Sequence, residues 1–451
     1  MKQDCQVLII GAGITGLMIA RELVRRGADD ILILEKEPGV GVHASGRNSG
    51  VLHAGLYYTS DTLTARFCIE GNRLLKAFCR EKGLPVQETG KVIVAKGPSD
   101  IKRLHELKRR AEVGGTQAFL IDQQTLTEHE PYASTYECAL FVPETAVIQP
   151  QAVLAALEKE LADSGKVSLC YETAFVDVLG DRMIRTSRGT VRFEQLFNAA
   201  GAHAERIAHR FGLGLDYTIL PMRGTYQRLI SDRSYLVRGN IYPVPDLRTP
   251  FLGVHLTRSV EGEVYVGPTA LPAWGREQYA RWGGWNREAG AILIREAVLF
   301  FANPGFRAAA LHVWRRILAR SLLQEARQLV PAIRQTDLKQ AEKVGIRPQL
   351  VHWPRKQLVM DFVVLTDGPT LHILNAISPA FTCSIPFARY AVSRLVTPSP
   401  APPVVMLAGG GHRGETAVLG DDVVGRADSD DSSVVQEEGP GAGGPDQIEV
   451  M

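Results

Sequence analysis

Residues Val7 to Gly16 read VLIIGAGITG, and the next apolar run, ILILEKE, has Glu35 at its end. An apolar strand that leads into Gly11, Gly13 and Gly16 is typical of a dinucleotide-binding turn, where glycines permit a tight turn, close approach to pyrophosphate and close helix packing. A helix then begins with its positive end at the phosphates. A glycine-rich turn in an unrelated α/β protein is the alternative, but here the strand, the helix and the acidic residue follow one another at the spacing that the motif requires.

Glu35 narrows the choice of dinucleotide. A carboxylate at the end of the second strand accepts both ribose hydroxyls and repels a 2′-phosphate. The pattern therefore excludes NADP and leaves NAD and FAD open.

The composition is that of a globular protein that can bury a large core. Of 451 residues, 45% are hydrophobic and 22% are charged. The net charge of +2 offers no electrostatic case for nucleic acid, and six cysteines without CxxC spacing predict neither zinc nor a disulfide framework. We expect no metal. Because no targeting or membrane-spanning segment is evident, we expect a cytoplasmic protein, with a peripheral position on the inner membrane as the alternative.

Helix-forming and strand-forming segments alternate through the first half of the chain. Residues 62–82 and 151–164 have helical periodicity, and KVIVA and the region near 167–176 read as strands. This alternation predicts an α/β protein, α+β overall.

A second nucleotide-side turn follows the run VRFEQLFNAAG at 191–201. The run predicts a strand that ends at Asn198 and opens a helix, so that Ala200 and Gly201 lie at the turn. Its distance from the first turn fits an FAD fold interrupted by insertions better than a compact NAD domain.

The remaining segments predict a second layer and a tail. Residues 221–270 are strand-like and indicate an antiparallel sheet over an active site, and residues 286–330 turn helical. The basic amphipathic stretch 307–327 either lies on an anionic bilayer or covers its own core with a solvated arginine face. Residues 397–451, rich in Pro, Gly and acids and without aromatic residues, predict a disordered acidic tail.

The loop His43 to Gly55, HASGRNSGVLHAG, is dense in glycine and small polar residues. Such a loop lets the main chain approach a flat, phosphate-bearing ligand, and its two histidines can act as base or electrostatic partner. A polar surface loop is the alternative. The segment resembles the HxxGxNSGVxHAG motif of the L-2-hydroxyglutarate oxidase/dehydrogenase family, within the superfamily of D-amino-acid-oxidase-like flavoproteins.

The resemblance spans about residues 5 to 395 and leaves out the tail. Further matches in chain order are Tyr57-Tyr58, Phe67-Cys68 with Gly71, Pro221–Tyr226, Gly239–Asp246, Phe251–Thr257, Val266–Pro268, Gly345–Arg347 and Asn375–Ser384. The resemblance implies bound FAD and oxidation of a small 2-hydroxy acid, best L-2-hydroxyglutarate, to the 2-oxo acid by hydride transfer to flavin N5. Electrons would pass to a quinone, another electron-transfer acceptor or oxygen.

Motif and resemblance together predict a Rossmann-like FAD-binding domain interleaved with an antiparallel-sheet substrate domain. We assign 1–82, 145–215 and 340–395 to the first, and 83–144 and 216–339 to the second, or cap, domain. The residues expected to bind FAD are Gly11, Gly13, Ile14, Thr15, Gly16, Glu35, Lys36, Ser45, Gly46, Arg47, Asn48, Ser49, Gly50, Ala200, Gly201, Ser378, Pro379 and Ala380.

The chain departs from the family pattern in two places. Ile377 and Phe381 replace Pro and Ala in the segment NAISPAFTCS, where bulkier side chains would reshape the wall beside the flavin. The stretch His352–Lys356 replaces an aspartate-glycine turn.

Oxidation of a 2-hydroxy acid needs a base for the hydroxyl proton and cations for the carboxylates. We expect His53 and His255 near the reacting atoms, although each could be a structural histidine. Arg347 and, second, Arg223 suit a substrate carboxylate, because guanidinium binds carboxylate bidentately; a surface ion pair is the alternative. Tyr242 could donate to the substrate or simply pack.

Two other functions fit the same residues. One is an FAD-dependent amino-acid or secondary-amine oxidase of the same superfamily. The other, of a different class, is a non-catalytic flavin-binding protein associated with membranes.

Overall fold

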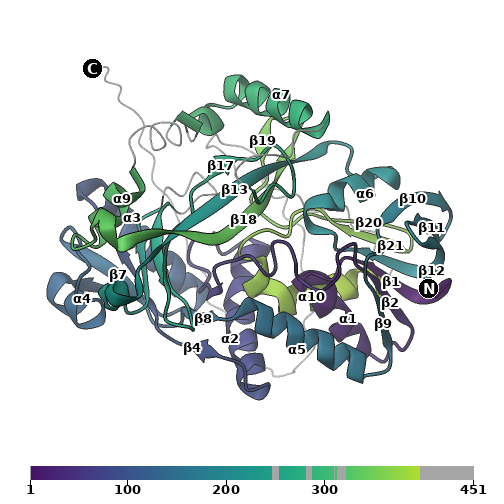
Figure 1. Cartoon of the computed structure of the whole chain (residues 1–451), viewed down its shortest axis with the longest axis horizontal. Helices are drawn as coiled ribbons and strands as arrows, with labels where there is room; N and C mark the ends of the chain where they lie inside the picture. Colours follow the sequence, from purple (N-terminus) through teal and green to yellow (C-terminus); the bar gives the residue numbers. More distant parts are fainter. Residues whose placement is uncertain (1, 246–252, 281–286, 309, 312–320, 397–451) are drawn as a thin grey trace, which may run out of the picture. The chain divides into compact units, whose positions relative to one another are not determined.

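The computed structural model describes residues 2–245, 253–280, 287–308, 310–311 and 321–396 (Figure 1). The chain divides into two units, Met1–Ala408 and Gly409–Met451, and the second lies wholly outside the described residues. The predicted disordered tail, 397–451, and residues 312–320 of the basic stretch also lie outside them. No helix within the described ranges is long and apolar enough to cross a membrane.

The first sheet has a parallel centre, with strand order β10-β11-β12-β1-β2-β9 and β21 paired to β12. Its central strand, β1, is buried on both faces, because Val7, Leu8, Ile9 and Ile10 are each at most 5% exposed and helices cover the sheet. The strands are β1 (Asp4–Ile10), β2 (Ile31–Leu34), β9 (Val167–Cys170), β10 (Phe175–Gly180), β11 (Met183–Thr186), β12 (Gly189–Asn198), β20 (Val364–Asp367) and β21 (Thr370–Ile373).

The second sheet is mainly antiparallel, with order β19-β18-β13-β16-β15-β14-β5-β7-β6 and β17 paired to β13. The long strands β13 and β18 run side by side in Figure 1 and pair from Tyr217 with His352 to Leu229 with Leu338. The strands are β5 (Lys91–Val94), β6 (Phe119–Asp122), β7 (Cys138–Val142), β13 (Tyr217–Leu229), β14 (Asn240–Pro243), β15 (His255–Arg258), β16 (Val264–Gly267), β17 (Leu271–Pro272), β18 (Leu338–His352) and β19 (Gln357–Leu358).

A small third sheet, order β3-β8-β4, joins Val51–Leu52, Ala146–Ile148 and Val86–Gln87. The helices within the described residues are α1 (Ile14–Arg25), α2 (Leu63–Glu81), α3 (Pro98–Gly114), α4 (Gln123–His129), α5 (Pro150–Asp163), α6 (Ala204–Arg210), α7 (Arg287–Ala302), α9 (Ser321–Leu329) and α10 (Ala380–Val396).

The predicted α/β class, α+β overall, is confirmed, and so are the helices at 62–82 and 151–164 and the antiparallel strands of 221–270. The prediction of one strand near 167–176 is wrong, because β9 ends at Cys170 and β10 begins at Phe175. Glu172 between them has a φ of 49°, which turns the chain. The two-domain division stays a prediction; β18, mostly inside the range assigned to the FAD-binding domain, pairs with the second sheet.

Helices α2 and α10 pack closely, and Gly71 permits the contact. A Cβ at position 71 would lie 2.0 Å from the carbonyl oxygen of Thr382. Since Thr382 also borders the cavity described below, this contact supports one wall of the site.

We predict that Gly71→Ala lowers the free energy of unfolding by about 1–3 kcal/mol, because the methyl group forces the two backbones apart. Thermal or urea unfolding followed by circular dichroism measures the change. Gly290→Ala in α7 is the matched control, because a Cβ there meets nothing within 4 Å. Equal stability of the two variants would contradict the proposed tight contact.

Candidate active site

One cavity of about 600 Å³ lies at the carboxyl ends of β1, β2 and β12, where parallel sheets bind ligands. Its lining comes from the first turn, the loop 41–53, the second turn, β13, β18 and the segment 376–382. Both sheets therefore contribute walls to a single site.

The glycine positions of the first turn have no room for a side chain. Gly11 has a φ of 105°, and a Cβ there would lie 2.7 Å from the carbonyl oxygen of Ala199. A Cβ at Gly13 would lie 3.0 Å from Ser45 Oγ, and one at Gly16 would lie 2.0 Å from the carbonyl oxygen of Gly11. The turn is thus a bare backbone cradle at the start of α1, where a helix dipole favours phosphate.

Glu35 stabilises this cradle by accepting two backbone hydrogen bonds. Its Oε2 accepts the backbone hydrogen of Ala12 at 2.8 Å, and its Oε1 accepts that of Glu37 at 3.0 Å. Ser45 Oγ accepts the backbone hydrogen of Ile14 at 3.0 Å, so the loop after β2 is docked on the start of α1.

Most residues expected to bind FAD border the cavity. They are Gly11, Gly13, Ile14, Thr15, Glu35, Lys36, Ser45, Arg47, Asn48, Ser49, Ala200, Gly201, Ser378, Pro379 and Ala380. Gly16, Gly46 and Gly50 are not among the lining residues. Each of these three permits a close backbone approach instead: a Cβ at Gly46 would lie 2.3 Å from the carbonyl oxygen of Gly41, and one at Gly50 would lie 2.4 Å from that of Ile148.

The second turn follows β12, as the sequence predicts. The buried Asn198 donates to the carbonyl oxygen of Ala204 at 2.8 Å, which fixes the start of α6 against the strand. Ala200 and Gly201 are thereby held at the cavity.

All five residues expected near the reacting atoms border the cavity: His53, His255, Tyr242, Arg223 and Arg347. The rings of Tyr242 and His255 stack at a centroid distance of 4.0 Å, and His255 Nδ1 lies 3.0 Å from the carbonyl oxygen of Gly253. His53 is buried, and its Nδ1 has no hydrogen-bond partner in the described structure.

The β13–β18 register separates the two arginines. Met222 lies opposite Arg347, and Arg223 lies opposite Ile346. Because side chains alternate along strands, Arg347 and Arg223 project from opposite faces of this pair. Arg347 therefore lies on the same face as Met222, and Arg223 lies on the other face.

Burial determines the charges at this wall. Removal from water lowers the pKa of His53 to about 3 and that of His255 to about 4, with a smaller contribution from nearby Lys91 in each case. Both imidazoles are therefore neutral at neutral pH. Burial also lowers the pKa of Arg347, while Tyr58 opposes this shift.

The two departures from the family pattern lie in different places. Ile377 and Phe381 border the cavity, so the bulkier side chains do shape its wall. His352–Lys356 connects β18 to β19 and is absent from the lining residues.

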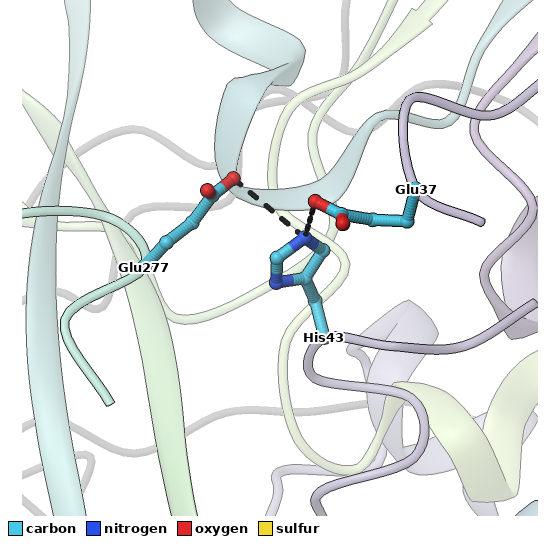
Figure 2. Close-up of side chains that lie close together, drawn as sticks. All are labelled: Glu37, His43 and Glu277. Atoms are coloured by element: carbon cyan, nitrogen blue, oxygen red, sulfur yellow. Dashed lines mark hydrogen bonds and ion pairs between the residues drawn. The ribbon is translucent and has the colours of Figure 1, made fainter. Parts of the chain in front are cut away.

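A polar cluster lies at the cavity, where His43 and Glu277 are lining residues and Glu37 is their neighbour (Figure 2). Glu37, His43 and Glu277 offer atoms within 4.8 Å of one another, a spacing that could hold a metal ion. Lys36 Nζ, however, lies 2.7 Å from Glu277 Oε1 and 2.9 Å from His43 Nε2, and it also pairs with Glu37. The Lys36 ammonium therefore occupies the place that a metal ion would take. The resulting ion-pair network of Lys36, Glu37, His43 and Glu277 is here called the latch.

Three residues of the segment 274–279, here called the strap, were missed by sequence reasoning. Arg276 forms two bonds to Glu205, at 2.6 and 2.7 Å, and Tyr279 Oη lies 2.7 Å from His43 Nδ1. Glu277 completes the strap through Lys36. The letters WGREQY match no local motif, so only their long-range partners show their role.

Residues 6–394 match the FAD dependent oxidoreductase family, and the chain belongs to this family. The cradle at Gly11 and Gly13 and the carboxylate of Glu35 fit the dinucleotide part of FAD. Among solved structures, L-alpha-glycerophosphate oxidase from Mycoplasma pneumoniae with FAD bound aligns with a TM-score of 0.68 at 21% identity, over 88% of this chain and 97% of that chain.

Named relatives are more similar in sequence. L-2-hydroxyglutarate dehydrogenase of Indibacter alkaliphilus is 35% identical, over 85% of this chain and 96% of the relative. The mitochondrial L-2-hydroxyglutarate dehydrogenase of Homo sapiens is 31% identical, over 84% of this chain and 86% of the relative.

We predict that Glu277→Gln releases FAD about three- to tenfold faster, because the strap loses its charged bonds to Lys36 and His203. Flavin fluorescence after dilution measures the rate. His203 and Lys36 hold the pKa of Glu277 down to about 2, so the contribution is complete above the ordinary value of 4.5 and is lost as pH falls toward 2.

The matched control is Glu263→Gln. Glu263 pairs with Arg228 and Tyr265, and none of the three lines the cavity. Equal release rates for the two variants would show that the strap does not retain the cofactor.

Proposed function

We propose that this protein oxidises L-2-hydroxyglutarate to 2-oxoglutarate. The observation that carries the proposal is a wall of two neutral histidines and a buried arginine, in a chain that resembles proteins named L-2-hydroxyglutarate dehydrogenase over most of its length. A base and a carboxylate-binding cation are what oxidation of a 2-hydroxy acid requires.

Each residue at the wall has a distinct task in this proposal. Arg347 binds a substrate carboxylate, and its burial strengthens that bond because water does not compete. His53 or His255 accepts the hydroxyl proton, and the carbonyl oxygen of Gly253 orients the His255 ring. Tyr242 holds that ring by stacking. Bound FAD supplies the acceptor for the hydride from C2.

Gly11, Gly13, Glu35, Lys36 and Ser45 would hold the dinucleotide part of FAD. The remaining residues expected to bind the cofactor keep that assignment as part of the proposal. The electron acceptor, a quinone, another electron-transfer partner or oxygen, and a place in the cytoplasm or on the inner membrane through residues 307–327 also belong to the proposal.

We predict that anaerobic addition of L-2-hydroxyglutarate bleaches the oxidised-flavin absorbance and yields 2-oxoglutarate, because the hydride reduces the flavin. An ultraviolet-visible spectrum before and after addition measures this. The D enantiomer is the control. An unchanged spectrum at millimolar substrate would overturn the proposal, and release of ammonia from an amino acid would favour an amine oxidase.

We predict that Arg347→Ala raises KM about 10- to 100-fold with a smaller effect on kcat, since a charged hydrogen bond to the carboxylate is lost. Steady-state kinetics measure both constants. Arg228→Ala, on the exposed part of β13, is the control. Kinetics of Arg347→Ala that match those of the control would remove Arg347 from the site.

A further inference from the structure

Lys91, the first residue of β5, is a buried lysine that has no counter-ion among the described residues. Its side chain is among the largest that are fully buried, at 1% exposure. Its Nζ has no hydrogen-bond partner in the described structure and lies 4.4 Å from the ring centroid of Tyr57 and 5.1 Å from that of Tyr242. Burying an unpaired ammonium is costly, and two aromatic faces offset only part of the cost.

The strand register puts Lys91 on the same face of the sheet as His255. β5 pairs in parallel with β14, with Ile93 opposite Tyr242, and β14 pairs with β15, with Ile241 opposite Leu256. Because side chains alternate, Lys91, Tyr242 and His255 lie on one face of three neighbouring strands. The Tyr242 ring contacts both the ammonium and the imidazole.

The segment after β3 covers this face from the other side. Tyr57, the second aromatic neighbour of Lys91, packs with Tyr242 in one buried cluster. Tyr57 Oη, His53 Nδ1 and Lys91 Nζ are buried atoms without a hydrogen-bond partner among the described residues. Lys91 and Tyr57 therefore lie behind Tyr242, which borders the cavity together with His53.

We propose that Lys91 is a positioning residue for the proposed reaction: its positive charge behind the wall adds to the effect of burial and lowers the pH at which His53 and His255 take up a proton from solvent. Like charges in a buried site repel strongly, so an imidazolium beside this ammonium is disfavoured. Among the described residues, Lys91, His53 and His255 form no ion pair with a carboxylate.

Among the other groups that face these three side chains, Cys68 partly opposes the effect of burial on Lys91. Burial raises the pKa of Tyr57 and Tyr242 further above the ordinary phenol value, so both are neutral. Cys68 of α2 donates its thiol hydrogen to the carbonyl oxygen of His53. Burial lowers the pKa of Lys91 to about 7, so its charge is complete below neutral pH, where an ordinary histidine would take up a proton.

The test compares Lys91→Met and Lys91→Gln, which remove the charge, with Lys91→Arg, which keeps it. The flavin-loaded proteins carry ¹³C-labelled histidine, and the signals of His53 and His255 are identified by His53→Asn and His255→Asn. We expect the pKa of at least one histidine to rise by roughly one unit in the neutral variants and to stay low in Lys91→Arg. The acidic limb of the pH profile of kcat for L-2-hydroxyglutarate should shift by the same amount as the histidine pKa, with KM little changed.

Lys343→Met is the matched control. Lys343 also packs against aromatic rings, 4.7 Å from the centroid of Tyr265, but it faces Glu261 and Glu263 and does not border the cavity. The histidine signals of the Lys343→Met variant, and the acidic limb of its kcat–pH profile, should match those of the unaltered protein.

Two results overturn the inference. One is a flavin-loaded neutral variant whose histidine titration and acid limb both superimpose on those of the unaltered protein. The other is a shift in Lys91→Arg as large as in Lys91→Met. If the unaltered protein does not oxidise L-2-hydroxyglutarate, the proposed function fails, but the histidine titration still decides whether Lys91 sets the charge of the pair.

Discussion

The close approach of the first turn to the end of β12 is the constraint on which the rest of the site depends. The position of a Cβ at Gly11 lies 2.7 Å from the carbonyl oxygen of Ala199, and that at Gly16 lies 2.0 Å from the carbonyl oxygen of Gly11. Two parallel strands and the start of α1 can meet this closely only without side chains. The contact sets the direction of α1, and Ser45 then docks the following loop on it.

The second organising effect is burial of the wall opposite this turn. The same loss of water lowers the pKa of His53, His255, Arg347 and Lys91. Every one of these groups is a base or a cation, so each shift disfavours positive charge. The wall therefore combines neutral imidazoles with Arg347, a buried cation that gains from binding an anion, while Lys91 lies behind the wall. This combination matches a carboxylate substrate that must also lose a proton.

What could be predicted from the sequence was local. The turn at Gly11, the acid at Glu35 and the helix at 62–82 depend on residues near one another in the chain, and the structure contains all three features. The roles of Glu277 and Lys91 depend on strands and loops far away, and no periodicity marks them. From the sequence alone, the lysine of KVIVA is interpreted as the polar end of an apolar strand. Its position near His255 becomes evident only from the pairing of β5, β14 and β15.

The strap also bears on how the protein is made. Tyr279 and His43 are 236 residues apart in sequence, yet they hydrogen-bond at the mouth of the cavity. During synthesis the cradle at Gly11 leaves the ribosome long before residues 274–279 exist. β12 is also made before the strap, whereas β21, which pairs with it, is made after the strap. The lining residues of β18 and of the segment 376–382 are made only after the strap, so the complete cavity exists only when nearly all of the described chain has been synthesised.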